Sequence, residues 1–365
     1  MISSWNTPLL LLLAKATTIL VAALGITLAM RRASAGTRHL VWLVTLGTLL
    51  LIPALTAWGP LRLHVLPPVP RAIPTTTLTT PDRGERAGRM FTGTPNPASP
   101  MPSTPAPRRA MSGLVPPLRD VDPLVVLLAV WSAVVVAIGA SLAYASLAVR
   151  RIVGHGRALD TPDWRAPLYE VADRLGLDEP PRLLRSDEAK MPFACGVLRP
   201  TIVLPAECDS WSLDRRRAVL LHELAHIRRH DLAGHTLGRL TCAIYWFHPL
   251  VWTAAKRLRS ESERACDDLA LACGTRATDY AEHLLEIVTS VRRDSTPSVA
   301  MAMARRKEFE GRMLAILDPE LRRGAPSRRQ SAVLIASLAL VSVAVGAAAP
   351  VPRTEPDPAG RTMAA

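Results

Sequence analysis

The stretch LLHELAHIRRHD, residues 220–231, contains a His-Glu-x-x-His pattern. The residues before it predict a helix that begins at Ser212 or Asp214, because either side chain can cap the first turn. Positions four apart lie on the same face of a helix, so His222 and His226 can both reach one metal ion. The stretch therefore predicts a metal site built on a helix.

Glu223 follows the first of these histidines, one step round the same helix. A carboxylate in this position can hold a water molecule that is bound to the ion. Zinc lowers the pKa of such a water and polarises a peptide carbonyl, while the glutamate takes the proton and passes it to the leaving amine. The pattern thus indicates a zinc endopeptidase, although a solvated helix with two histidines would show the same five residues.

A third ligand distinguishes these alternatives, because zinc hydrolases usually use three protein ligands and leave one position open. A metzincin would have glycine at position 229 and histidine at position 232, but the chain has Arg229 and Leu232. His230 continues the face of His222 but lies two turns along the axis, too far away to share the ion. The metzincin class is therefore excluded.

Residues 249–274 supply a better third ligand on a second predicted helix, which has proline in its first turn and glycine after its end. Glu263 and Asp267 are four apart on one face of this helix. We expect Glu263 to provide the third ligand and Asp267 to orient a ligating histidine through its second ring nitrogen. The neighbouring Glu261 and Asp268 do not belong to this pair and are expected to be solvated.

The composition is that of an integral membrane protein. The chain has 365 residues, of which 49% are hydrophobic, and its mean hydropathy is +0.18 despite 32 prolines, so apolar blocks must alternate with polar ones. A helix that spans a bilayer needs about 20 apolar residues. Four stretches meet this requirement, two of them within residues 1–58: 7–30, 40–58, 123–149 and 331–349.

Basic residues beside short loops mark the cytoplasmic side of a membrane protein. They lie next to the predicted spans in three groups: Arg31, Arg32 and Arg38; Arg150 and Arg151; Arg322, Arg323, Arg328 and Arg329. This distribution predicts a multi-pass protein of the inner (cytoplasmic) cell membrane, with both termini outside and residues 150–330 in the cytoplasm. Residues 59–122 are rich in proline, threonine and arginine and are expected to form a disordered external loop.

The formal net charge of +13 does not indicate a nucleic-acid-binding protein, because much of the excess flanks the membrane spans or lies in residues 150–330, which would face anionic lipid. Direct binding of nucleic acid would require a recognition motif or a basic face with stacking aromatics, and the sequence contains neither. The five cysteines also lie within 150–330, where we expect buried, reduced thiols. The lipid bilayer is the expected partner of the basic residues.

Four blocks of the chain resemble the BlaR/MecR-type membrane zinc metallopeptidases, an antirepressor family first met in beta-lactam sensing. The blocks are PFACGVLRPTIVLP (192–205), LLHELAHIRRHD (220–231), YWFHPLVW (245–252) and ERACDDLA (263–270). The resemblance implies an α-helical membrane protein of about four transmembrane helices. It also implies a cytoplasmic, mainly helical α+β protease domain of the gluzincin type.

The resemblance further implies a bound Zn2+ ion with three ligands: His222, His226 and Glu263. Glu223 would be the catalytic acid and base, and Asp267 would support a ligand. One apolar run would form either an edge strand that pairs with an extended substrate or a core strand: Thr201, Ile202, Val203 and Leu204. Four residues remain alternatives as donors to the oxyanion: Tyr245, His248, Tyr280 and His283.

The chain departs from the antibiotic-sensing members, in which a penicillin-binding sensor domain with a Ser-x-x-Lys nucleophile follows the fourth span. Here only residues 350–365 follow, and they contain no such motif. The resemblance therefore supports the protease and not the detection of beta-lactams. Self-cleavage after the protease core is also implied for the family; the comparable segment is 312–319, where Pro319 disfavours cleavage of the preceding bond.

These observations predict an integral membrane zinc endopeptidase that transduces a signal by regulated proteolysis, cleaving a cytosolic repressor or itself. By resemblance, its protein partner would be a winged-helix repressor of the BlaI/MecI type. One alternative is a membrane gluzincin of the HtpX or prenyl-protease kind that acts in quality control. Another is a non-catalytic signal transducer in which zinc only holds the fold.

Overall fold

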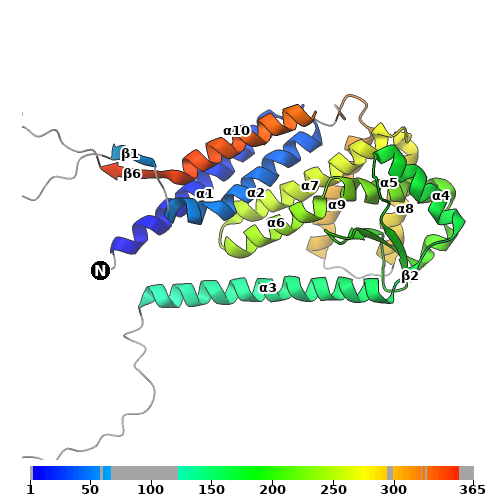
Figure 1. Cartoon of the computed structure of the whole chain (residues 1–365), viewed down its shortest axis with the longest axis horizontal. Coiled ribbons are helices and arrows are strands. Elements are labelled where there is room, and N and C mark those ends of the chain that lie inside the picture. The colour runs from blue at the N-terminus through cyan, green and yellow to red at the C-terminus, as the bar shows by residue number, and fades with distance from the viewer. Residues whose placement is uncertain are drawn as a thin grey trace, which may run out of the picture.

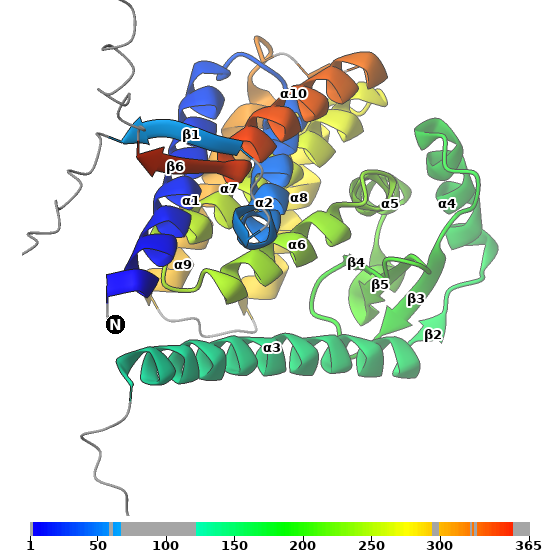
Figure 2. The same cartoon turned by 60° about the vertical axis from the view of Figure 1, so that its left-hand side comes forward.

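The computed structural model describes residues 3–57, 61–66, 122–293, 299–321, 323–324 and 327–352. Most of the predicted external loop, 59–122, lies outside the described residues. Its beginning forms β1 (Leu61–Leu66), which pairs in parallel with β6 (Ala348–Pro352) after the last helix (Figure 2). The expectation of a disordered loop is therefore wrong for residues 61–66.

Four apolar helices form one end of the molecule (Figure 1): α1 (Ser3–Ala29), α2 (Ala35–Ala57), α3 (Pro123–His155) and α10 (Arg328–Ala347). By length and composition, three segments can cross a membrane: Leu10–Ala29, Ala35–Thr56 and Pro123–His155. The last helix coincides largely with the fourth predicted span, but its described apolar part, Arg329–Val345, is shorter than these three.

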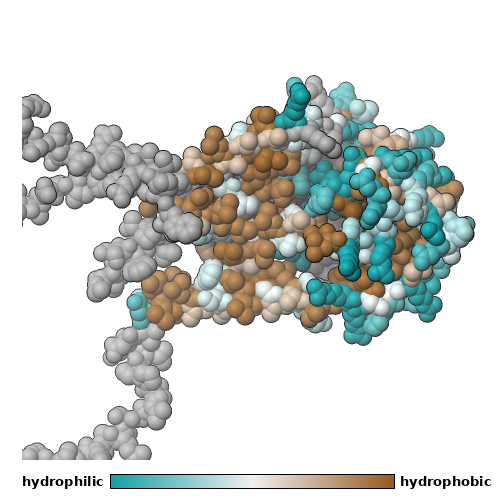
Figure 3. Space-filling model, in the orientation of Figure 1, coloured by the Kyte–Doolittle hydropathy of each residue, from teal (hydrophilic) through white to brown (hydrophobic). Residues whose placement is uncertain are grey.

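Apolar side chains gather over these four helices, whereas polar side chains gather over the opposite end of the molecule (Figure 3). The helices α1, α2 and α10 pack together, and α3 runs along the other side with no buried residue (Figure 1). Its Trp131 donates a hydrogen bond to the carbonyl of Ile244 at the end of α6 over 2.9 Å. Large side chains such as Val136 and Tyr144 on α3 are exposed by 68% and 76%. A bilayer around this end would remove such surfaces from water.

The polar end contains a four-stranded sheet in the order β2 (Arg157–Ala158), β3 (Arg182–Ser186), β5 (Thr201–Pro205) and β4 (Phe193–Cys195). β5 pairs in parallel with β3 and antiparallel with β4, and all five of its residues are buried. The expectation of an edge strand at 201–204 is therefore wrong, and the core-strand alternative is confirmed. The continuous apolar run suits a strand that is covered on both faces. Among the described residues, β4 forms the edge next to β5, and the two-residue β2 forms the opposite edge.

Six longer helices complete this part of the chain: α4 (Pro162–Leu175), α5 (Leu213–Arg228), α6 (Asp231–Ile244), α7 (Pro249–Ala272), α8 (Ala277–Arg293) and α9 (Val299–Leu317). Ser212 caps α5 as predicted, since its hydroxyl accepts a hydrogen bond from the backbone N–H of Arg215 over 3.3 Å. His230 has a left-handed backbone conformation with φ 56°. It therefore separates α5 from α6, and the prediction that it continues the face of His222 is wrong.

The helices around the sheet and those near the membrane form two separate cores. The first contains residues of α4, α5, α8 and the sheet, while the second joins α6 and the first half of α7 to α1 and α2. At the tip of the α6–α7 hairpin, Tyr245 donates a hydrogen bond to the carbonyl of Leu49 over 2.8 Å. Nearby, His248 Nε2 lies 3.0 Å from Thr17 Oγ1. The hairpin thus lies alongside the candidate membrane spans.

Candidate metal centre

The two histidines of the His-Glu-x-x-His pattern lie one turn apart on α5 and direct their Nε2 atoms toward the same point. The Nε2 atoms of His222 and His226 are 3.3 Å apart, with the two rings perpendicular to each other. Two nitrogens bound to one tetrahedral zinc ion at about 2.0–2.1 Å would lie roughly 3.3–3.4 Å apart. This spacing therefore fits a shared zinc ion.

Glu263 on α7 faces this pair of nitrogens. Its Oε2 lies 3.6 Å from His222 Nε2, and its Oε1 lies 3.9 Å from His226 Nε2. The three side chains can each offer one ligand atom within 4.8 Å of the others. Two imidazole nitrogens and one carboxylate oxygen are a donor set that zinc uses in hydrolases. The structure thus brings together the three residues that the sequence singled out as ligands.

The ring of His222 is held from behind by Asp267 and Tyr280. The Nδ1 of His222 lies 2.9 Å from the hydroxyl of Tyr280 and 3.4 Å from Asp267 Oδ1. The tyrosine donates its own proton to Asp267 Oδ1 over 3.0 Å, so it can only accept from the histidine. This network keeps a proton on Nδ1 and turns Nε2 toward the ligand site, as such outer partners commonly do.

The same contacts set the charge of His222. Burial alone would lower the pKa of its ring, but hydrogen bonds with Asp267 and Glu263 outweigh burial and raise it to about 10. A metal ion must therefore displace a proton from this histidine when it binds.

Arg312 on α9 was not anticipated from the sequence. Its Nη1 lies 2.9 Å from Glu263 Oε2, and its Nη2 and Nε donate to the two carboxylate oxygens of Asp267 over 2.8 Å and 2.9 Å. Burial would raise the pKa of Asp267, but the guanidinium charge and the hydrogen bond from His222 lower it to about 2. Arg312 thus keeps both carboxylates ionised and fixed in position. No motif around it in the sequence signals this role.

His226 is held by Asp231, the last residue of the stretch 220–231. Asp231 is 1% exposed, and its Oδ2 accepts a hydrogen bond from His226 Nδ1 over 3.0 Å. It also accepts hydrogen bonds from Arg229 and from the thiol of Cys266. The position of Asp231, five residues after His226, is the sequence feature that could have indicated this supporting role.

A second group of side chains lies close enough together to hold a metal ion, judged by distance alone: His226, Asp231 and Cys266. Burial and the charge of Asp231 raise the pKa of the Cys266 thiol well above its usual value. A thiol must lose its proton to bind a metal ion. We therefore assign this group to the support of His226.

Glu223 lies on α5 beside the ligand residues and is only 8% exposed. Burial and the nearby charge of Glu223 raise the pKa of the Cys195 thiol. Helix α5 also packs against β4. The helix that carries the prospective base and this edge strand are thus neighbours.

The four candidate oxyanion donors lie in different parts of the structure. Tyr280 lies behind His222, whereas Tyr245 and His248 contact α2 and α1, as described above. His283 Nδ1 lies 3.9 Å from Glu286 on its own helix.

The expectation that Glu261 and Asp268 are solvated is wrong: Glu261 is 6% exposed and pairs with Arg38, and Asp268 is partly buried.

The arrangement agrees with the comparison of the chain with known proteins. It is 26% identical to the regulatory protein BlaR1 of Bacillus licheniformis over 221 residues, which are 60% of this chain and 36% of that protein. It is 30% identical to the methicillin resistance mecR1 proteins of Staphylococcus aureus and Staphylococcus epidermidis over 77 residues, 21% of this chain and 13% of each of them.

The chain thus corresponds to about a third or less of the length of these curated relatives. The sequence profile of the BlaR1 peptidase M56 family extends much further along the chain and matches residues 7–316. This match runs from the first apolar helix through both helices of the candidate metal centre and reaches α9. The chain therefore belongs to the BlaR1 peptidase family M56.

Proposed function

We propose that this chain is an integral membrane zinc endopeptidase that relays a signal by regulated proteolysis. The observation that carries the proposal is the convergence of the Nε2 atoms of His222 and His226 with the carboxylate of Glu263. Three ligands of this kind leave the fourth position of a tetrahedral zinc ion free for water or substrate. Membership of a peptidase family supports the same conclusion.

The roles of the side chains follow from their positions. Zinc held by His222, His226 and Glu263 would polarise the scissile carbonyl and lower the pKa of a water molecule. Glu223 would take the proton of that water and pass it to the amine nitrogen as the peptide bond breaks. Its burial keeps bulk water away from this proton transfer, because the side chain is only 8% exposed.

The substrate would pair with β4 rather than with β5. Both sides of β5 are already hydrogen-bonded, whereas β4 has no second partner strand among the residues that the structure describes. An extended peptide can add to such an edge through main-chain hydrogen bonds. The packing of β4 against α5, which carries Glu223, supports this choice, because the scissile bond would have to lie beside Glu223.

The arginines beside the membrane spans support a cytoplasmic location of the centre. A cytosolic repressor of the winged-helix type is the substrate we propose, because four blocks of the chain resemble the BlaR/MecR-type antirepressors and one relative is named as a regulatory protein. Self-cleavage is less favoured within 312–317, because these residues belong to α9 and Ile316 is 1% exposed. Pro319 and Glu320 lie outside this helix and are exposed, so the bonds after Pro319 are the more accessible ones.

The test compares newly formed protein N-termini in cells that carry the wild type, Glu223→Gln or the control Glu207→Gln. Glu207 is an exposed glutamate next to the sheet, so its substitution should change nothing. We expect termini that appear with the wild type and the control but not with Glu223→Gln. A repressor fragment among them would identify the signalling role, whereas fragments of misfolded membrane proteins would indicate quality control.

Metal analysis of the same purified proteins separates catalysis from structure. We expect one zinc ion per chain in the wild type and in Glu223→Gln, and loss of zinc in Glu263→Ala. Signalling that survives in Glu223→Gln with zinc retained would show a non-catalytic transducer. An active preparation free of metal would contradict the whole proposal.

A further inference from the structure

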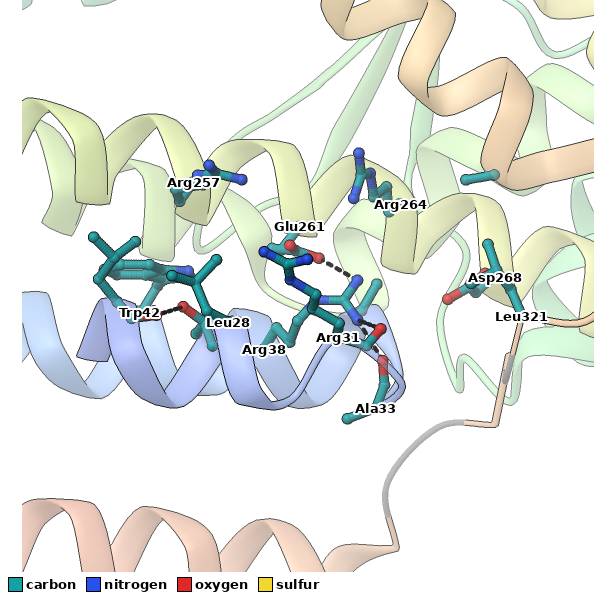
Figure 4. Close-up of a pocket in the computed structure, with 14 residues that line it drawn as sticks. Leu28, Arg31, Ala33, Arg38, Trp42, Arg257, Glu261, Arg264, Asp268 and Leu321 are labelled. Carbon is teal, nitrogen blue, oxygen red and sulfur yellow. Dashed lines mark hydrogen bonds and ion pairs between the residues drawn. The ribbon is translucent and has the colours of Figure 1, made fainter. Parts of the chain in front are cut away.

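A cavity of about 350 Å³ lies away from the metal centre, where the turn between α1 and α2 meets α7 (Figure 4). Six charged residues line it: Arg31, Arg38, Arg257, Glu261, Arg264 and Asp268. Four of these belong to α7 at positions 257, 261, 264 and 268, which lie on one face of a helix. Glu263 and Asp267, which face the metal centre, lie on a neighbouring face of the same helix.

The charges in this cavity do not cancel. Arg38 pairs with Glu261 over 2.8 Å and is thereby neutralised. Among the described residues, the remaining guanidinium groups of Arg31, Arg257 and Arg264 have no ion-pair partner, and only Asp268 opposes them. The Nε of Arg264 is buried without a hydrogen-bond partner in the described part of the chain. An unpaired buried donor of this kind is costly unless an anion or water satisfies it.

One wall of the cavity is largely apolar and belongs to the first two helices that can cross a membrane. Leu24 and Leu28 on α1 and Trp42 on α2 form this wall, and all three lie within the segments that can cross a membrane. Arg31 and Arg38 lie at the facing ends of these two segments, where lipid headgroups would be, and Arg257 and Arg264 line the same cavity from α7. A free anion would gain no stabilisation from this apolar wall, whereas the acyl chains of a lipid would be buried against it.

We propose that this cavity binds the phosphate of an anionic phospholipid, with its acyl chains lying along Leu24 and Leu28. Guanidinium groups bind phosphate oxygens through paired hydrogen bonds, and basic pockets between membrane helices hold anionic headgroups. A phosphate here would connect Arg31 on the α1–α2 turn to Arg257 and Arg264 on α7. It would thereby hold the helix that carries Glu263 against the membrane. The proposal does not depend on the protease activity.

The test is native mass spectrometry of the whole purified chain in detergent micelles, titrated with phosphatidylglycerol, with phosphatidylcholine or with inorganic phosphate alone. We expect about a tenfold preference for phosphatidylglycerol, which the double variant Arg257→Gln/Arg264→Gln reduces to twofold or less. The matched control, Arg150→Gln/Arg151→Gln, removes the same charge at the end of α3, outside the cavity, and should keep the preference.

An equal loss of preference in both double variants would show diffuse attraction to the surface and overturn the proposal. Retention of inorganic phosphate at the same site, without preference among lipids, would overturn the lipid assignment. The melting temperature in phosphatidylcholine serves as the folding control. If the α7 double variant fails to fold, Arg31→Gln on the exposed turn gives the same test, with about a threefold loss of preference expected.

Discussion

Asp231 lies between the candidate metal centre and α2, a helix that can cross a membrane. Its Oδ2 accepts a hydrogen bond from Nδ1 of His226 over 3.0 Å, while its Oδ1 lies 3.7 Å from Nε2 of His39 on α2. Both Asp231 and His39 are buried, with 1% and 4% of their surface exposed. One carboxylate therefore joins a prospective zinc ligand to a segment that can cross the membrane.

We first predict that Asp231→Asn weakens zinc binding by about 10- to 100-fold, because it removes the charged partner that orients His226. Competition with a chromogenic chelator measures this affinity in the purified protein. Asp160→Asn is the control, since Asp160 is exposed. An unchanged affinity in Asp231→Asn would contradict the supporting role of this carboxylate.

A second prediction concerns the contact between α2 and the metal centre. His39→Gln should lower zinc affinity by a few-fold, less than Asp231→Asn, because His39 acts on the ligand only through Asp231. In the double variant the two effects should differ from additivity by more than about 0.5 kcal/mol, as expected for residues in one network. Additive effects would show that the two residues are independent.

The third prediction distinguishes two roles for Tyr280. Its hydroxyl links His222 Nδ1 to Asp267, so Tyr280→Phe should reduce zinc affinity by about tenfold. With saturating zinc, peptide cleavage should return to near the wild-type rate. A rate that stays low at full zinc occupancy would instead show that Tyr280 contacts the reacting carbonyl. Chelator competition and cleavage of a fluorogenic peptide provide the two measurements.

A fourth prediction concerns stability. Arg312→Gln leaves the carboxylates of Glu263 and Asp267 close together without their shared cation. Loss of one partner of a buried ion pair costs about 3 kcal/mol, which for a chain of 365 residues lowers the melting temperature by roughly 4 °C. Arg276→Gln is the control, because the Arg276 side chain is 80% exposed. Equal melting temperatures for the two variants would contradict the structural role of Arg312.

A fifth prediction follows from the donor set. Removal of zinc with a chelator should lower the melting temperature and abolish cleavage, and added zinc should restore both. In Glu223→Gln, zinc should stabilise the protein as it does in the wild type while cleavage stays absent. If a chelator leaves the melting temperature unchanged, the three residues do not hold an ion that contributes to folding.

Much of the local structure could be predicted because it depends on residues close together in the chain. The N-cap at Ser212 and the helix from Pro249 are confirmed, since capping and the fixed φ of proline act within one helical turn. The i, i+4 spacing likewise puts His222 with His226, and Glu263 with Asp267, on one face of a helix. For the same reason the apolar stretches at the N-terminus were recognisable as segments that can cross a membrane.

Other features depend on which elements pack together. The run at 201–204 has the same apolar residues whether it forms an edge or an inner strand, and only its pairing with both β3 and β4 decides between them. Glu261 was expected to be solvated, but α7 packs against α2 and brings it to Arg38. Such neighbours, distant in the sequence, leave no periodic pattern in either segment.

The helical metal motif, the helix that carries Glu263 and Asp267, and the apolar spans could be recognised in the amino-acid sequence, because spacing and hydropathy are local properties of the chain. The support of the candidate ligands by Tyr280, Arg312 and Asp231 became visible only in the folded protein. Arg312 lies 45 residues after Asp267, and His39 lies on another helix from Asp231. Long-range hydrogen bonds and ion pairs of this kind depend on how whole helices pack, and that packing is settled by the buried surfaces of the entire fold.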